Sequence, residues 1–142
     1  MNAVLFTWTI VEFVAHFFLR LSIDLLSSID KATGSRFNDL IWGDAGNNTL
    51  DGAGGNDQLG GGAGEDIFVF GAGAGQDLVQ DFSVGAHDVV AIRDHVFADY
   101  ADVMAHTTQV GADAVIGADA ATTLTLHNYL KTSLASYDFL FL

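Results

Sequence analysis

The chain carries a row of carboxylate and amide side chains at a constant spacing of nine residues. Asp39, Asn48, Asp57 and Asp66 occupy the sixth position of four consecutive units, GSRFNDLIW, GDAGNNTLD, GAGGNDQLG and GGAGEDIFV. If the units stack as successive turns about 5 Å apart, these carboxylates repel one another unless a cation lies between them. Calcium, a hard cation, accepts carboxylates together with backbone carbonyls, in flexible coordination by about six to eight oxygens.

The same units predict the elements that must hold this row in place. Every unit begins with glycine, and most of the 16 glycines of the chain lie between Gly34 and Gly75, where they permit tight turns. The eighth position is always large and apolar, namely Ile41, Leu50, Leu59 and Phe68. One such residue between small or polar neighbours suits a short strand with a single inward side chain. Because one short strand cannot bury its own face, the units are expected to stack and share a thin core.

These units resemble the RTX, or haemolysin-type calcium-binding, nonapeptide repeat G-G-x-G-x-D-x-U-x, in which U is a large apolar residue. The resemblance implies a parallel β-roll with two nonapeptides in each coil. It also implies that calcium lies between turns on the same side of the roll, two units apart. Asp39 would then pair with Asp57 on one edge, and Asn48 with Asp66 on the other.

The resemblance further implies a set of calcium ligands, made up of the position-six side chains and the carbonyls of the turns. The expected side-chain ligands are Asp39, Asn48, Asp57, Asp66 and Asp77, and the carbonyl ligands lie near Gly34, Gly43, Ala45, Gly52, Gly54, Gly61 and Ala63. One site for each adjacent pair of turns gives roughly two or three calcium ions. Two departures from the pattern are expected to weaken binding. The first unit has Ser35, Arg36 and Phe37 in place of small residues, and Asn48 lacks a charge.

The segment after the regular units is expected to close and flank the roll. FVFGAGAGQDLVQDF (68–82) resembles the family's closing turn, and SVGAHDVVAI (83–92) places Asp88 in an acid position. Residues 97–106 favour a short helix, and TQVGADAVIGAD with TTLTLHN favours an antiparallel pair of strands. The expected fold is therefore mainly β, a parallel β-roll over 34–82 and a β-rich C-terminal flank over 83–142 with one short helix.

The last residues, SLASYDFLFL, place Asp138 before a short apolar tail. This tail resembles the uncleaved C-terminal signal of type I secretion, which would make the secretion apparatus a partner of the chain. The alternative is a last strand that covers the open end of the roll, and the two interpretations are compatible.

Residues 1–30 are strongly apolar and lie outside the repeat. The pattern predicts a helix over residues 3–26 with one polar stripe at Glu12, His16, Arg20 and Asp24. Charges inside the only window of sufficient length disfavour a membrane span, and the lack of a basic start disfavours a secretory signal peptide. The open alternatives are a helix packed on the body of the protein, membrane contact through residues 1–26, and the remnant of a longer chain or a wrongly assigned start.

Composition excludes several classes of function. With 18 acidic against 5 basic residues, the net charge of -13 repels phosphate backbones and argues against nucleic-acid partners. The absence of cysteine removes disulfides, thiolate zinc sites and cysteine nucleophiles. The scattered histidines have no metal-ligand spacing, and the chain lacks the motifs of serine hydrolases, P-loop proteins and zinc proteases. We therefore expect no catalytic residues in this chain.

The resulting expectation is a secreted, calcium-binding module that folds on calcium after export. Two other classes stay open. In the first, the chain is the C-terminal fragment of a larger secreted enzyme, such as a protease, lipase or polysaccharide epimerase. In the second, it is a small membrane-associated adhesion or toxin-like protein that depends on calcium.

Overall fold

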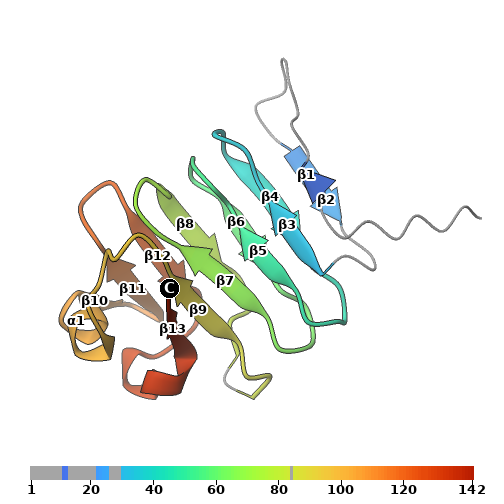
Figure 1. Ribbon diagram of the computed structural model, residues 1–142. Coiled ribbons are helices and arrows are strands. Elements are labelled where there is room, and N and C mark those ends of the chain that lie inside the picture. Colours follow the sequence, from blue (N-terminus) through green and yellow to red (C-terminus); the bar gives the residue numbers. More distant parts are fainter. Residues whose placement is uncertain (1–10, 13–21, 26–29, 84) are drawn as a thin grey trace, which may run out of the picture.

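Two sheets of short strands stack face to face in the computed structural model, which describes residues 11–12, 22–25, 30–83 and 85–142 (Figure 1). The first sheet has the order β1-β3-β5-β7-β9-β13. Its strands are β1 (Val11–Glu12), β3 (Lys31–Thr33), β5 (Thr49–Asp51), β7 (Ile67–Phe70), β9 (Val89–Ile92) and β13 (Phe139–Phe141). The second sheet has the order β10-β11-β12-β8-β6-β4-β2. Its strands are β2 (Ser22–Leu25), β4 (Asp39–Trp42), β6 (Gln58–Gly60), β8 (Gln76–Val79), β10 (Thr107–Val110), β11 (Asp113–Gly117) and β12 (Thr123–Leu126).

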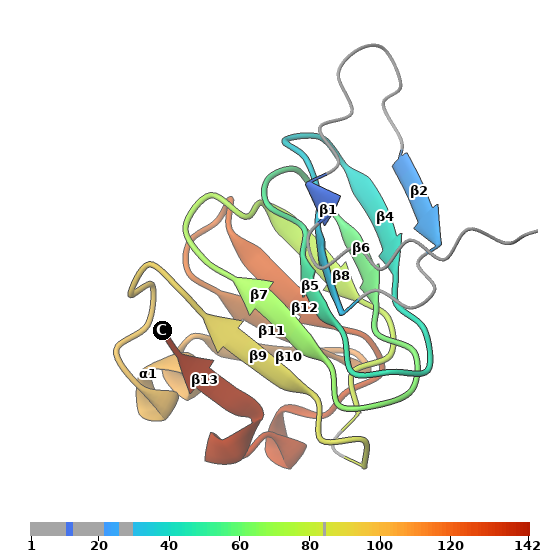
Figure 2. The ribbon, with the colours of Figure 1, turned by 45° about the vertical axis from the view of Figure 1, so that its right-hand side comes forward.

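From β2 to β9 the chain alternates between the two sheets, and neighbouring strands in each sheet are parallel (Figure 2). Ile41 is the partner of Leu59 in one sheet, and Leu50 is the partner of Phe68 in the other, so equivalent residues are 18 positions apart (59 − 41 and 68 − 50). One coil therefore contains two nonapeptides. The predicted parallel β-roll is confirmed.

The core lies between the two sheets and is one side chain thick in the regular coils. The eighth residue of each unit points inward, and Ile41, Leu50, Leu59 and Phe68 are all at most 2% exposed. Because alternate residues point to opposite faces, strands of three or four residues supply one large inward side chain each in the regular coils, except β7, which supplies both Phe68 and Phe70. Towards the C-terminal end the core widens through Phe82, Phe97, Val103, Ile116, Leu124, Leu126 and Tyr129.

The C-terminal flank continues both sheets of the roll. β12 pairs in parallel with β8, and β13 pairs in parallel with β9. β10, β11 and β12 form an antiparallel meander, as expected for the paired strands of this region. The one α-helix of the described residues, α1 (Tyr100–Ala105), follows Asp99, whose side chain accepts a hydrogen bond from the backbone N–H of Asp102. Two short 3-10 helices, η1 (Lys131–Ser133) and η2 (Ser136–Asp138), lead into β13.

Most of the helix predicted for residues 3–26 falls outside the described residues. The two stretches of it that the structure describes are extended rather than helical, because β1 pairs with β3 and β2 pairs with β4, both in parallel. The prediction is wrong at these two stretches. A parallel strand there satisfies backbone groups that the first coil would otherwise leave open at its edge. Within the described part of the chain, no helix has the length and apolar character needed to cross a membrane.

Candidate metal centre

The turns of the roll stack along two opposite edges, and each edge carries one row of buried position-six side chains. The turns that lead into β4, β6 and β8 place Asp39, Asp57 and Asp77 in one row. The turns that lead into β5, β7 and β9 place Asn48, Asp66 and Asp88 in the other. All six side chains are buried. The nine-residue spacing thus becomes two rows, because successive units end on opposite edges.

Four of the carboxylates, those of Asp57, Asp66, Asp77 and Asp88, each use one oxygen to hold the preceding turn of their row. Asp57 Oδ1 accepts the backbone N–H of Asp39 at 2.7 Å, and Asp77 Oδ1 accepts that of Asp57 at 3.0 Å. On the other edge Asp66 Oδ1 accepts the N–H of Asn48 at 2.8 Å, and Asp88 Oδ1 accepts that of Asp66 at 3.0 Å. These bonds fix the orientation of each carboxylate and therefore the direction of its second oxygen.

The second oxygens of Asp57 and Asp66 are the unusual atoms of the molecule. Within the described residues, Asp57 Oδ2 and Asp66 Oδ2 are the buried side-chain oxygens that have no hydrogen-bond partner. Leaving a buried carboxylate oxygen unsatisfied is costly, and such groups in native structures call for an explanation such as a bound ion. One of these oxygens lies on each edge of the roll.

Backbone carbonyls lie beside the same row of side chains. A Cβ atom on Gly34 would lie 2.5 Å from the carbonyl oxygen of Gly52 and 2.7 Å from Asp39 Oδ2, so both oxygens approach one point. On the other edge a Cβ on Gly43 would clash with Asn48 Oδ1 and with the carbonyl oxygen of Gly61. Glycine is required at these positions because any side chain would fill the space between the oxygens. Carboxylate and carbonyl oxygens make up a donor set that fits calcium.

The first two turns differ from the later ones in how their side chains are satisfied. Asp39 Oδ2 accepts hydrogen bonds from the backbone N–H and the hydroxyl of Ser35, at 2.6 and 3.0 Å. Asn48 Oδ1 accepts the N–H of Asp44 at 2.8 Å. The second residues of the first two units, Ser35 and Asp44, therefore donate to the side chains of their turns, whereas Asp57 Oδ2 and Asp66 Oδ2 receive no hydrogen bond within the described residues.

The remaining predicted carbonyl residues lie in the stacked turns, where their backbone N–H groups join neighbouring coils. Gly54 donates to Ser35 O at 3.0 Å and Ala63 to Asp44 O at 3.1 Å. Gly34 and Gly43 donate to the last residue of the strand in the next coil, Asp51 and Gly60. Ala45 is exposed at the tip of its turn. That the carbonyl oxygens of these five residues bind calcium stays a prediction.

Burial governs the charge state of the rows in the absence of an ion. Desolvation raises the pKa of Asp57 to about 7, opposed by the hydrogen bond from the Asp39 backbone and reinforced by the charges of Asp77, Asp39 and Asp51. Desolvation also raises the pKa of Asp77 to about 6. The pKa values of Asp66 and Asp88 are raised for the same first reason. A divalent cation reverses this tendency because it stabilises the ionised carboxylates.

Two acids outside the predicted ligand set belong to the second edge. Asp88 closes the row above Asp66, although it follows Asp66 by 22 residues (88 − 66) rather than 18. Asp81 Oδ1 and Oδ2 accept the N–H groups of Gly61 and Gly62, both at 2.9 Å. The sequence gives a signal for Asp88 through its G-x-x-D segment. It gives none for Asp81, because the longer turn between β8 and β9 breaks the nine-residue period.

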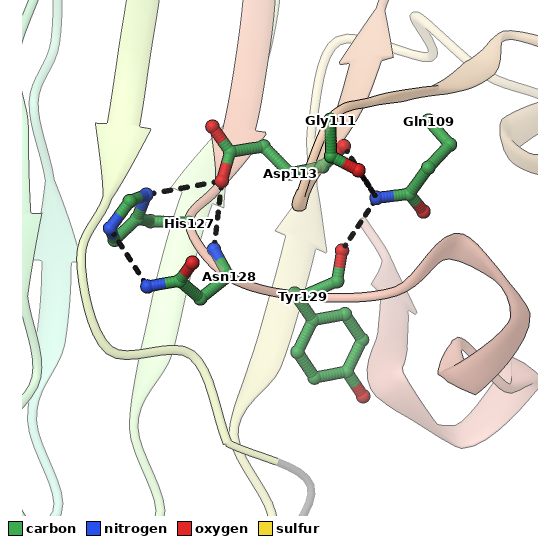
Figure 3. Close-up of polar contacts among 6 residues, drawn as sticks. All are labelled: Gln109, Gly111, Asp113, His127, Asn128 and Tyr129. Carbon is green, nitrogen blue, oxygen red and sulfur yellow. Dashed lines mark hydrogen bonds and ion pairs between the residues drawn. The ribbon is translucent and has the colours of Figure 1, made fainter.

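In the C-terminal flank, a cluster of polar residues is joined by hydrogen bonds that connect neighbouring strands and turns (Figure 3). Asp113 Oδ1 accepts the backbone N–H of Asn128 at 2.8 Å and lies 3.1 Å from His127 Nδ1. Gln109 Nε2 donates to the carbonyls of Asp113 and Gly111, at 2.9 and 3.3 Å, and so closes the turn between β10 and β11. Among the residues that the structure describes, no three acidic or histidine side chains converge as a metal-binding group. The candidate ion positions in the roll instead combine carboxylates with backbone carbonyls.

Comparison with known proteins agrees with this geometry. A family model of the RTX calcium-binding nonapeptide repeat matches residues 27–59 and 61–77, as four copies. These two stretches of the chain are therefore similar to the RTX repeat, and repeats of this kind bind calcium.

A search of solved structures matches the extracellular lipase LipA from Serratia marcescens, with a TM-score of 0.75 and 23% sequence identity. The match covers 84% of this chain and 19% of the lipase chain, so this chain corresponds to about a fifth of that protein. At this identity the likeness shows the fold. No curated protein matches the chain.

Proposed function

We propose that this chain is a calcium-dependent folding module of an exported protein, with calcium held between adjacent turns on both edges of the roll. The observation that carries the proposal is the pair of buried, unsatisfied oxygens, Asp57 Oδ2 and Asp66 Oδ2. Each lies in a turn whose neighbours on the same edge supply further carboxylate and carbonyl oxygens. The family match of the same segment supports calcium as the ion.

The proposed ligands differ between the two edges. On the first edge Asp39, Asp57 and Asp77 contribute carboxylates, together with the carbonyl of Gly52. On the second edge Asn48, Asp66 and Asp88 contribute side-chain oxygens, together with the carbonyl of Gly61. Because one unsatisfied oxygen lies on each edge, we expect at least two ions, in line with roughly two or three for one ion per adjacent turn pair.

Calcium then acts as the switch for folding. Near neutral pH and without calcium, the stacked carboxylates of each row must either take up protons that the unfolded chain does not bind or repel one another, and both disfavour the closed roll. At extracellular calcium, sites with dissociation constants of about 0.1–1 mM fill and stabilise the stacked turns. In calcium-poor cytoplasm the chain stays open for export, and the apolar C-terminal tail contacts a type I secretion apparatus. The proposed location is extracellular.

The decisive experiment is a calcium titration of the full chain followed by circular dichroism. The spectrum is expected to change cooperatively between zero and about 10 mM calcium. Asp57→Ala should raise the calcium midpoint about tenfold, because it removes one charged ligand and leaves the Asp39 N–H without its acceptor. The matched control is Glu65→Ala, which removes the same charge from an exposed neighbouring turn position. A spectrum that calcium leaves unchanged would contradict the proposal. Equal calcium midpoints for the two variants would rule out Asp57 as a ligand.

A second candidate places this module at the C-terminal end of a larger secreted enzyme. The match to only 19% of an extracellular lipase favours this version, because the aligned fold there is a small part of a longer chain. Catalysis would then come from residues outside this chain. Sequencing the gene upstream of Met1 tests this candidate. A continuous reading frame with hydrolase or lyase motifs would support it, and an in-frame stop codon directly upstream would contradict it.

A further inference from the structure

A second ladder of hydrogen bonds runs beside the carboxylate rows, one residue earlier in each turn. Asn38 Oδ1 accepts the backbone N–H of Asn56 at 2.9 Å, and Asn56 Oδ1 accepts the N–H of Gln76 at 2.9 Å. On the opposite edge, Asn47 Oδ1 accepts the N–H of Glu65 at 2.9 Å. All three asparagines are exposed, so this ladder lies on the solvent side of the buried acids.

The two ladders run in opposite directions. In the inner ladder the earlier turn donates to the later one, as in Asp39 N–H to Asp57 Oδ1. In the outer ladder the later turn donates to the earlier one, as in Asn56 N–H to Asn38 Oδ1. Adjacent turns are thus joined by two antiparallel hydrogen bonds at consecutive residues. Two such bonds fix the tilt of one turn against the next as well as their separation.

The outer ladder also adds no charge to an edge that is already rich in carboxylates. A neutral amide oxygen can accept the N–H without adding a further repulsive pair of charges. The ladder therefore joins adjacent turns of the folded roll without adding to the repulsion between the carboxylates. A calcium site built from oxygens of two different turns needs such fixed turns, because its affinity depends on how well the oxygens are positioned before the ion binds.

We propose that Asn38, Asn47 and Asn56 are positioning residues, which hold adjacent turns at the separation that calcium binding requires and so set the calcium affinity of their own edge. This inference rests on the proposed calcium sites of the roll. It assigns to the fifth position of the turn a role that is distinct from that of the ligands at the sixth position.

The chain provides its own matched control at Glu65. Glu65 occupies the same fifth position in its turn and is exposed, and its backbone N–H takes part in the ladder. Within the described residues its carboxylate accepts no hydrogen bond. Glu65→Ala therefore keeps every bond of the ladder, whereas Asn56→Ala removes the acceptor of the Gln76 N–H.

The test compares calcium isotherms of the full chain, measured by titration calorimetry with calcium chloride. Asn56→Ala should raise the dissociation constant of one class of sites about fivefold, the effect of losing one typical hydrogen bond. Asn56→Asp, which keeps the acceptor oxygen, should bind within about twofold of the unmodified chain or more tightly, and Glu65→Ala within about twofold. An Asn56→Ala isotherm identical to that of Glu65→Ala would overturn the inference.

A double-variant comparison separates positioning from general destabilisation. Asp57→Asn disables the edge on which Asn56 lies. In that background Asn56→Ala should leave the remaining calcium sites unchanged, while Asn47→Ala, on the opposite edge, should still weaken them. Equal weakening by both would overturn the inference. If the unmodified chain takes up no calcium, the proposed function itself fails, whereas uptake that is insensitive to Asn56 rejects only the role of the asparagines.

Discussion

Asp57 and Asp66 occupy the same repeat position as Asp39 and Asn48, yet their surroundings differ. Ser35 and Asp44 donate hydrogen bonds to the side chains of Asp39 and Asn48. In the next two units the corresponding N–H groups of Ala53 and Gly62 donate to Asp51 Oδ1 and Asp81 Oδ2. Asp57 and Asp66 therefore each keep one unsatisfied oxygen in the described part of the molecule, which is the oxygen that a cation would satisfy.

The raised pKa values of Asp57 and Asp77 predict how the calcium-free chain responds to pH. Because both values, about 7 and about 6, lie above the ordinary 3.8, the folded state favours the protonated carboxyls. Their contribution to stability is complete below about pH 4 and is lost as the pH rises through about 6 to 7. In a chelator, the urea midpoint should therefore fall over this window.

The control for this pH profile is the double variant Asp57→Asn, Asp77→Asn, which keeps neutral groups at both positions. Its urea midpoint should depend less steeply on pH. The affinity for calcium should change in the opposite direction and rise with pH, because the ion competes with protons for the same oxygens. Parallel profiles for the unmodified chain and the double variant would contradict the assignment.

The glycine that opens each turn gives a second prediction at this scale. A Cβ on Gly52 would overlap Asp57 Oδ2, so Gly52→Ala must displace the carboxylate. We expect a loss of about 1–3 kcal/mol in the free energy of unfolding and a higher calcium midpoint of folding. In the same turn, a Cβ on Gly54 would meet its nearest atom, Gly73 O, at 3.5 Å, so Gly54→Ala is the matched control. Equal losses for both variants in urea titrations would rule out this account.

At the scale of elements, the roll and its flank depend on one another. β9 and β12 complete the hydrogen bonding of β7 and β8, and Phe82 packs edge-on against Tyr129 with ring centroids 5.2 Å apart. Arg93, just after β9, forms an ion pair with Asp51 at the end of β5, at 2.6 Å. The last regular coil is therefore capped by strands that come from the flank, so no open sheet edge is left there.

A chain that ends at residue 82 tests this dependence. It lacks β9 and β12 and exposes the edges of β7 and β8 together with the core residues Phe68 and Phe70. We expect it to bind calcium weakly and to show no cooperative change in circular dichroism up to about 10 mM calcium. The full chain measured in parallel serves as the reference. A truncated chain that folds at the same calcium midpoint would show that the regular coils suffice.

At the scale of the whole molecule, calcium changes both stability and net charge. Two or three ions would reduce the net charge from -13 to roughly -9 or -7 (-13 + 4 or -13 + 6). For dissociation constants of about 0.1–1 mM, 10 mM calcium contributes about 1.4–2.7 kcal/mol for each site. The ions would thereby stabilise a domain whose regular part has a thin core and whose sequence contains no cysteine for disulfides.

Scanning calorimetry can measure this contribution directly. Two filled sites should raise the Tm by on the order of 10 °C at 10 mM calcium. Magnesium at the same concentration should raise it much less, because magnesium requires stricter octahedral geometry. Sodium chloride at matched ionic strength controls for the screening of the negative charge. An equal rise in Tm with the calcium, magnesium and sodium salts would mean that screening, and not specific binding, stabilises the roll.

The nine-residue period alone established the inward column from Ile41 to Phe68 and the recurring acids, because each regular unit repeats the same small set of contacts. The coil of two units, with its offset of 18 residues, followed from the resemblance to the RTX repeat and is confirmed by the strand register. The tertiary structure decided the rest. Longer turns raise the offset between paired residues to 20 and then 22, which places Asp77 over Asp57 and Asp88 over Asp66. Pairings between distant segments, such as β8 with β12 and β9 with β13, leave no periodic trace, because they depend on how the flank packs against the last coil. The direction in which each carboxylate oxygen points follows from those contacts and not from the order of residues.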